Sequence, residues 1–251
     1  SGTATLTVHF NGANEGGGGN QYLWSALTNG QVLAFDPEQD ELRFDDPSIS
    51  AASIVFGTGD DQLTLRVIAQ GKTVDLDYVV TGPGVPITTS NFTFADGSQV
   101  LAGDNTISQT ADDGNSTLSG TIHDDFLFGL GGDDQLDGLD GNDLFAMFLG
   151  GGPGANYGHD TVHGGNGFDR IMFLDDPHAT GVTVDMALGT ASGGDDAGGS
   201  TSTVAFTSIE AITGTGLADV IQGDNFDNLL EGRGGNDTLN GRDGDDTLNG
   251  G

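Results

Sequence analysis

Cysteine is absent from the 251 residues, and basic side chains are scarce. Only 6 Lys and Arg stand against 38 Asp and Glu, which gives a formal net charge of −32. Without cysteine there is no disulfide framework, so a secreted protein of this sequence must be stabilised in another way. So negative a surface repels DNA, RNA and anionic lipid, which excludes nucleic-acid binding. The natural counter-charge is a metal cation, a basic partner or dissolved salt.

Long apolar runs and familiar catalytic motifs are missing as well. No run reaches the length of a membrane span, and the first residues, SGTATLTVHF, do not resemble a signal peptide. An export signal is therefore expected outside this sequence. HExxH and GxSxG are absent, which excludes a zinc-protease helix and a lipase nucleophile elbow. We find no catalytic constellation, so we expect no enzyme activity.

Residues 1–105 show the alternating pattern of antiparallel β-structure. Residues 52–56 and 62–67 flank a turn rich in Gly and Asp, which predicts a hairpin, and apolar residues alternate over 72–80. No helical period extends over ten residues. We therefore predict an all-β fold in which 1–105 form a small antiparallel β-sandwich-like domain.

Residues 106–251 hold most of the 45 glycines and repeat a nine-residue unit, G-x-x-G-x-D-x-U-x, in which U is apolar. The units form three groups, at 111–146, 155–172 and 214–249. Position six is occupied by Ser116, Asp125, Asp134, Asp143, Asp160, Asp169, Asp219, Asn228, Asp237 and Asp246. Position eight is occupied by Leu118, Leu127, Leu136, Phe145, Val162, Ile171, Ile221, Leu230, Leu239 and Leu248. A solvated linker has no reason to place apolar residues so regularly.

The unit has a direct physical interpretation. The residues x-U-x form a short strand with only U facing inward, and the six preceding residues form a turn in which glycine supplies unusual backbone angles. Two units return the chain beside its start, so coils stack about 4.8 Å apart. Asp125 then neighbours Asp143, and Asp219 neighbours Asp237. Stacked carboxylates repel one another, and together with exposed carbonyls they suit Ca²⁺ better than Mg²⁺ or Zn²⁺.

This pattern resembles the repeats-in-toxin family, whose haemolysin-type repeats bind calcium in a β-roll. The resemblance implies a parallel β-roll with several Ca²⁺ ions between its turns, and it implies ligands from position six and from earlier turn positions. The candidate ligands are Asp125, Gly131, Asp133, Asp134, Asp140, Asn142, Asp143, Asp160, Asn166, Asp169, Asp219, Asn228, Gly234, Asn236, Asp237, Asp243, Asp245 and Asp246. Ser116 and Asn228 carry no charge, so weak or empty sites are expected there.

The repeats divide the chain further. We predict a first roll block over 106–172, a β insert or cap over 173–213 and a second roll block over 214–251. The resemblance also raises self-cleavage, because some members of the family cut themselves at Asp-Pro when calcium binds. Asp-Pro occurs at 36–37, 46–47 and 176–177, but no other residue matches, so self-cleavage is not favoured.

Other candidate sites have simpler explanations. His159 and His163 could suggest a transition-metal or acid–base site, but both occupy variable positions of a repeat unit. Tyr22 and Trp24 could present an aromatic face for a glycan or a partner chain, but a core role is favoured.

Three functions remain open from the sequence. In the first, the chain is an extracellular calcium-binding structural module that folds on Ca²⁺ binding after export, within a large surface, matrix or adhesin-type protein, where neighbouring copies or other segments are partners. In the second, it is the carrier region of a secreted enzyme or toxin. In the third, residues 1–105 have a binding role. Secretion or display at the cell surface of a Gram-negative bacterium is the expected location.

Overall fold

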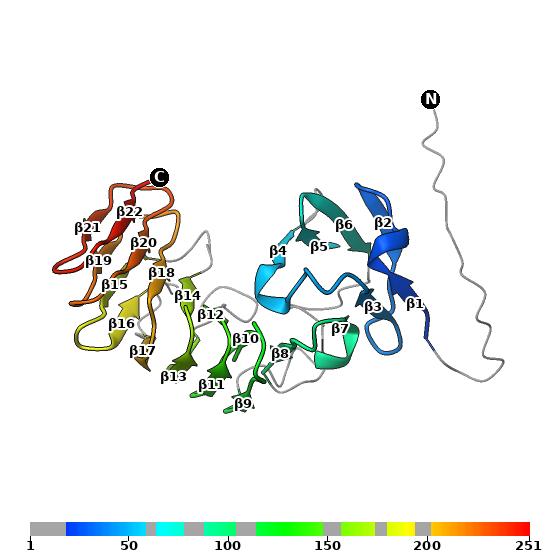
Figure 1. Ribbon diagram of the computed structural model, residues 1–251, viewed down its shortest axis with the longest axis horizontal. Coiled ribbons are helices and arrows are strands. Elements are labelled where there is room, and N and C mark those ends of the chain that lie inside the picture. The colour runs from blue at the N-terminus through cyan, green and yellow to red at the C-terminus, as the bar shows by residue number, and fades with distance from the viewer. Residues whose placement is uncertain are drawn as a thin grey trace.

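The computed structural model describes residues 19–58, 64–77, 88–103, 114–147, 157–173, 180–193 and 202–251, and these parts are built of strands and short 3-10 turns (Figure 1). The all-β prediction is confirmed. No helix in the described ranges is long and apolar enough to cross a membrane.

The described residues from Val100 onward form a roll of two facing sheets. The seven-stranded sheet runs in the order β22-β20-β18-β14-β12-β10-β8 and the eight-stranded sheet in the order β21-β19-β15-β16-β17-β13-β11-β9. The first contains β8 (Val100–Ala102), β10 (Phe126–Phe128), β12 (Leu144–Met147), β14 (Arg170–Phe173), β18 (Ala211–Thr213), β20 (Leu229–Glu231) and β22 (Thr247–Asn249). The second contains β9 (Thr117–Ser119), β11 (Gln135–Asp140), β13 (His159–Asn166), β15 (Val182–Asp185), β16 (Thr190–Gly193), β17 (Thr203–Thr207), β19 (Val220–Gln222) and β21 (Thr238–Asn240).

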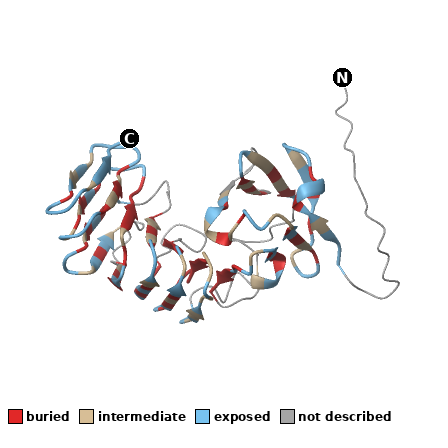
Figure 2. Cartoon of the chain, viewed as in Figure 1, coloured by how far each residue is buried: buried red, intermediate tan, exposed pale blue. Residues whose placement is uncertain are grey.

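Position eight sets the register of the roll. Leu127 pairs with Phe145, Ile221 with Leu239 and Leu230 with Leu248, all in parallel. The inward residues form one core between the sheets, visible as buried stripes in Figure 2. The position-eight residues that are no more than 1 % exposed are Leu127, Leu136, Phe145, Val162, Ile171, Ile221 and Leu230. Each such burial contributes about 1.5–3 kcal/mol. The predicted parallel β-roll is confirmed.

The segment between the repeat groups makes the two sheets unequal. In the seven-stranded sheet β14 and β18 lie between β12 and β20, whereas β17, β16, β15 and β19 lie between β13 and β21. Only β16 runs antiparallel to its neighbours. Two additional strands lengthen one face by about 10 Å, so the stack curves. Figure 1 shows the row of strands turning between β13 and β19.

The region before the roll has its own two sheets. A three-stranded sheet contains β1 (Gln21–Leu23), β3 (Glu41–Phe44) and β7 (Phe92–Phe94), and a four-stranded sheet contains β2 (Gln31–Ala34), β6 (Lys72–Asp77), β5 (Thr64–Ala69) and β4 (Val55–Thr58). The short turns are η1 (Trp24–Ala26), η2 (Ala51–Ser53) and η3 (Thr89–Asn91).

The predicted antiparallel pairing is confirmed for part of this region only. The hairpin expected over 52–67 is β4–β5, and β5–β6 is antiparallel too. However, β1–β3–β7 and β2–β6 pair in parallel, which corrects the prediction. Parallel partners are joined by long crossovers and leave no local turn signal. The last residues of the 72–80 pattern lie outside the described residues.

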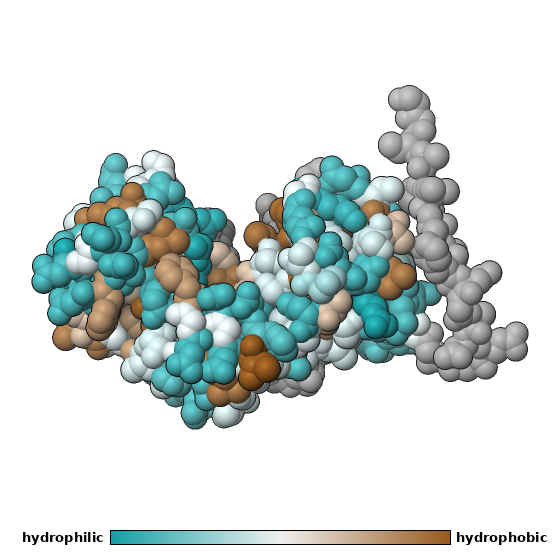
Figure 3. All heavy atoms as spheres, viewed as in Figure 1, coloured by the Kyte–Doolittle hydropathy of each residue, from teal (hydrophilic) through white to brown (hydrophobic). Residues whose placement is uncertain are grey.

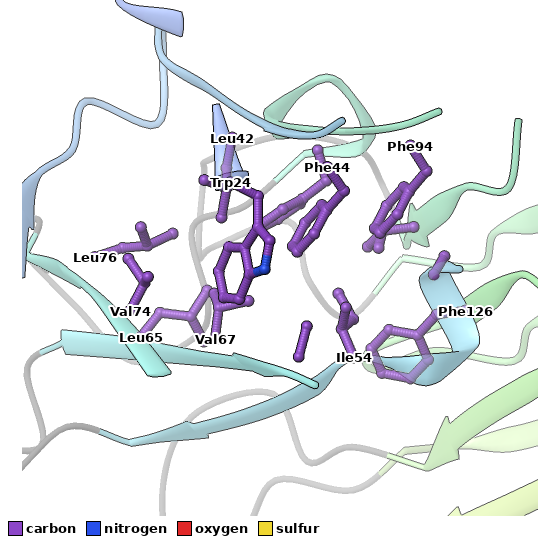
Figure 4. Close-up of a cluster of buried hydrophobic side chains, with 14 of the residues drawn as sticks. Trp24, Leu42, Phe44, Ile54, Leu65, Val67, Val74, Leu76, Phe94 and Phe126 are labelled. Atoms are coloured by element: carbon purple, nitrogen blue, oxygen red, sulfur yellow. The ribbon is translucent and has the colours of Figure 1, made fainter. Parts of the chain in front are cut away.

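Trp24 is 3 % exposed and packs at a tilt against Phe44, with ring centroids 4.8 Å apart, so it is a core residue (Figure 4). Tyr22 packs against the same core. Asp36 and Asp46, which precede Pro37 and Pro47, accept N–H bonds from Glu38 and Ser48 in tight turns. The third Asp-Pro bond, 176–177, lies outside the described residues.

One hydrophobic cluster joins the first region to the outside of the roll. Outward-facing Phe126, Phe128 and Leu144 of the seven-stranded sheet belong to the same core as Trp24. Phe126 lies 5.4 Å from Phe56, measured between ring centroids, and Figure 4 shows Phe126 beside Ile54. The domain division at residue 105 therefore stays a prediction, because β8 already belongs to a roll sheet and the first core continues across the junction.

Candidate metal centre

The position-six side chains form two columns, one along each edge of the roll. The first column consists of the position-six residues that precede strands of the seven-stranded sheet: Asp125, Asp143, Asp169, Asn228 and Asp246. The second column consists of Ser116, Asp134, Asp160, Asp219 and Asp237. The expected neighbours, Asp125 with Asp143 and Asp219 with Asp237, are in contact.

One carboxylate oxygen of each column aspartate accepts a hydrogen bond from a backbone N–H of the previous coil. The backbone N–H of Asp125 donates to Oδ1 of Asp143 at 2.8 Å, and that of Asp143 donates to Oδ1 of Asp169 at 2.8 Å. In the second column, the N–H of Asp134 donates to Oδ1 of Asp160 at 3.0 Å. These bonds are charge-assisted, so each carboxylate ties two coils together.

The second carboxylate oxygen divides the turns into two kinds. In the turns that we call open, Oδ2 is buried and accepts no hydrogen bond from the described residues; this is the case for Asp134, Asp143, Asp169 and Asp237. In each open turn the residue at position two has a positive φ, as at Leu130 (71°) and Leu139 (78°). With this backbone angle the N–H of position two does not donate to the position-six carboxylate, as it does in the turns of the second kind.

In the turns that we call self-capped, that N–H satisfies the position-six side chain. Thr121 donates its backbone N–H and its hydroxyl to Oδ2 of Asp125, and Thr215 donates its N–H to Oδ2 of Asp219 at 2.8 Å. Asp224 donates its N–H to Oδ1 of Asn228 at 2.8 Å. Thr or Asp at position two is the sequence signal of a self-capped turn, and the repeat pattern alone does not reveal it.

Glycine at position one lets oxygens of two coils converge. A Cβ on Gly138 would lie 2.2 Å from Oδ2 of Asp143 and 2.6 Å from the carbonyl oxygen of Gly164 in the next coil. Asn228 and Gly241 make the same arrangement around Gly223. Because no side chain intervenes, a carboxylate and a carbonyl oxygen share one small volume.

The other candidate ligands lie at positions three and five of the turns. Position-five side chains accept backbone N–H groups of the next coil: Asp133 from His159 at 2.9 Å, and Asn142 from Phe168 at 2.9 Å. Asn166 donates its side-chain amide to Asp140 at 2.8 Å. Gly131, Gly234, Asn236, Asp243 and Asp245 also lie in these turns, exposed except for Gly131. As side-chain or carbonyl ligands, all of these residues remain predictions.

Burial raises the pKa of several column aspartates. Desolvation raises the pKa of Asp143 to about 7 and that of Asp160 to about 8, and neighbouring carboxylates add to both increases. Desolvation likewise raises the pKa of Asp134 and of Asp169 to about 6. An unpaired buried carboxylate therefore needs a proton or a cation.

These donors fit a hard cation. The converging atoms are carboxylate and carbonyl oxygens, the ligands that Ca²⁺ prefers, six to eight at a time. No three His, Asp or Glu side chains gather into a metal-holding group within the described residues, so backbone carbonyls must complete any shell. His159 and His163 do not join the columns; each ring Nδ1 contacts a threonine hydroxyl, at 2.8 and 2.6 Å, on β17.

Comparison with known families agrees with this geometry. The family profile described as RTX calcium-binding nonapeptide repeat (4 copies) matches residues 110–145, 154–172 and 213–251. No curated protein sequence matches the chain. Repeats of this kind bind Ca²⁺, several ions to an array, and they typify secreted proteins. The matched part of the chain therefore consists of RTX repeats, and the roll that they form is a calcium-binding module.

Proposed function

We propose that residues 106–251 are an extracellular structural module that folds when it binds calcium after export, within a large surface, matrix or adhesin-type protein of a Gram-negative bacterium. The observation that carries this proposal is the set of buried carboxylate oxygens, at Asp134, Asp143 and Asp169, that have no donor among the described residues. An unpaired buried carboxylate costs several kcal/mol, so the metal-free roll is destabilised. The role of the ions is structural, and we assign no catalysis to this chain.

Calcium can supply the stability that disulfides would give. Extracellular modules bind Ca²⁺ with a Kd of about 10⁻⁴–10⁻³ M. At a free concentration ten times the Kd, each ion adds about 1.4 kcal/mol. Several ions together approach the whole stability of an ordinary domain, about 5–15 kcal/mol. Folding should therefore depend steeply on calcium concentration.

The test is a circular-dichroism titration of the chain from excess chelator to millimolar Ca²⁺. We expect β-structure to appear cooperatively, with Mg²⁺ at the same concentration much less effective because of its tighter octahedral preference. The same β signal in chelator as in calcium would contradict the proposal.

The alternative is that this module is the carrier region of a secreted enzyme or toxin. The calcium-dependent roll serves that role equally well. The distinguishing experiment is to determine the sequences that flank residues 1 and 251 in the gene, since a catalytic domain encoded beside the roll would favour the carrier role.

A further inference from the structure

The first column contains an acidic residue outside the repeat pattern. Between β17 and β18 the chain turns in three residues, Ser208, Ile209 and Glu210, where the repeat units use six. Ser208 has a φ of 55°, which allows so sharp a turn, and Ile209 is buried in the core of the roll. The repeat profile ends at residue 172 and resumes at 213, so this turn belongs to neither matched block.

Glu210 occupies the place of the missing aspartate. The backbone N–H of Asp169 donates to Oε2 of Glu210 at 2.8 Å, the bond that Asp143 receives from Asp125. The backbone of Glu210 is paired on both sides, since its N–H donates to the carbonyl of Asp169 and its carbonyl accepts from Leu229. The additional methylene of glutamate compensates for a turn three residues shorter. Glu210 thus extends the first column beyond Asp169, and its carbonyl joins this turn to Leu229, which follows Asn228.

The oxygens that converge in open turns also converge here. Oδ2 of Asp169 is buried and accepts no hydrogen bond from the described residues, and Asp169 is 0 % exposed. A Cβ on Gly164 would lie 1.9 Å from the carbonyl oxygen of Ser208 and 2.5 Å from Oδ2 of Asp169. Gly138 has the equivalent neighbours, with the carboxylate oxygen supplied by Asp143 and the carbonyl oxygen supplied by Gly164.

We propose that Asp169, the Ser208 carbonyl and Glu210 form a calcium site that joins the two repeat blocks. The inference rests on the proposed function, because it assumes that calcium fills the open turns. Here the ion would bridge the insert, at the point where two additional strands interrupt the regular stacking of coils. The site lets both blocks fold as one unit.

The test compares Glu210→Gln with Glu231→Gln in the complete chain. The side-chain amide introduced by Glu210→Gln can still accept the Asp169 N–H through its oxygen, but it lacks the negative charge. Glu231 is the matched control, because it lies on the seven-stranded sheet, pairs with Arg170 at 3.0 Å and belongs to neither column. Native mass spectrometry in calcium should show one ion fewer for Glu210→Gln and the wild-type number for Glu231→Gln. The calcium midpoint of folding should rise only for Glu210→Gln.

Equal ion numbers in Glu210→Gln and in wild type would overturn the inference and leave the proposed function intact. A wild-type chain that binds no calcium would overturn both. If Glu210→Gln does not fold, crystals of the wild-type chain grown with terbium decide the question. An anomalous peak beside Asp169 and Glu210 is expected; peaks at Asp134 and Asp143 without one there would overturn the inference.

Discussion

Asp143 illustrates at the residue scale why a buried carboxylate makes a fold conditional. Its Oδ1 accepts the N–H of Asp125, while its Oδ2 is buried and accepts no hydrogen bond from the described residues. The rise of its pKa from an ordinary 3.8 to about 7 means that the folded environment disfavours the charged form, relative to water, by roughly 4 kcal/mol when no metal is bound. A proton and a calcium ion therefore compete for the same oxygen.

This competition predicts how the metal-free protein responds to pH. The folded pKa values of Asp143 and Asp160 are about 7 and about 8, above that of the unfolded chain, so between about pH 4 and pH 8 the folded state holds protons that the unfolded state has released. Stability without calcium should then fall as pH rises through this window. In chelator, the β signal in circular dichroism should be larger at about pH 5 than at about pH 8. A β signal in chelator that stays constant or grows with pH would contradict this.

Removing one charge should have opposite effects with and without calcium. Asp143→Asn keeps an acceptor for the N–H of Asp125 and eliminates the buried charge. We expect the variant to be more stable than wild type in chelator at mildly alkaline pH, and less stable in millimolar Ca²⁺ with one bound ion fewer. Urea unfolding under both conditions measures the two changes. A loss of stability under both conditions would show that Asp143 acts through packing alone.

At the element scale, the turns depend on glycine at some positions and tolerate side chains at others. Gly138→Ala places a Cβ 2.2 Å from Oδ2 of Asp143 and 2.6 Å from a backbone carbonyl, so the turn must shift. We expect a loss of about 1–3 kcal/mol in calcium and a weaker site. Gly234→Ala is the control, because its nearest neighbour would be 3.6 Å away. Thermal unfolding in calcium distinguishes the two, and equal melting temperatures would contradict the role of position one.

The sequence predicts the roll well because its period is local, whereas three other features depend on distant contacts. Position eight set the register, and the nine-residue spacing brought Asp125 beside Asp143. Glu210 lies outside the period and is recognised only when Asp169 is placed opposite it. The parallel pairing of β1, β3 and β7 joins segments far apart in the chain. Phe126 and Phe128 face outward, where the repeat pattern allows any residue. Two large apolar side chains at such positions indicate a contact with another part of the chain, here the core of the first region.

At the scale of the whole molecule, charge and the shared core act together. Figure 3 shows hydrophilic residues over most of the visible face, as a net charge of −32 requires, with apolar patches on the roll. That charge opposes a compact state and favours cation binding. The roll in turn supplies Phe126, Phe128 and Leu144 to the core of the first region. Folding of the first region should therefore depend on the metal sites, although none of its own residues is a predicted ligand.

Trp24 allows this dependence to be measured, because it is the only tryptophan and lies buried beside Phe44 in the shared core. We expect its fluorescence to change on calcium addition at the midpoint seen by circular dichroism. Phe126→Ala should separate the two signals, because it removes the ring 5.4 Å from Phe56 and leaves the columns untouched. The control is Phe226→Ala, which alters a side chain that is 74 % exposed in a turn of the roll. If the fluorescence of the wild-type chain does not change when calcium is added, the first region folds independently of the metal sites. The junction would then be a contact between two domains that fold separately.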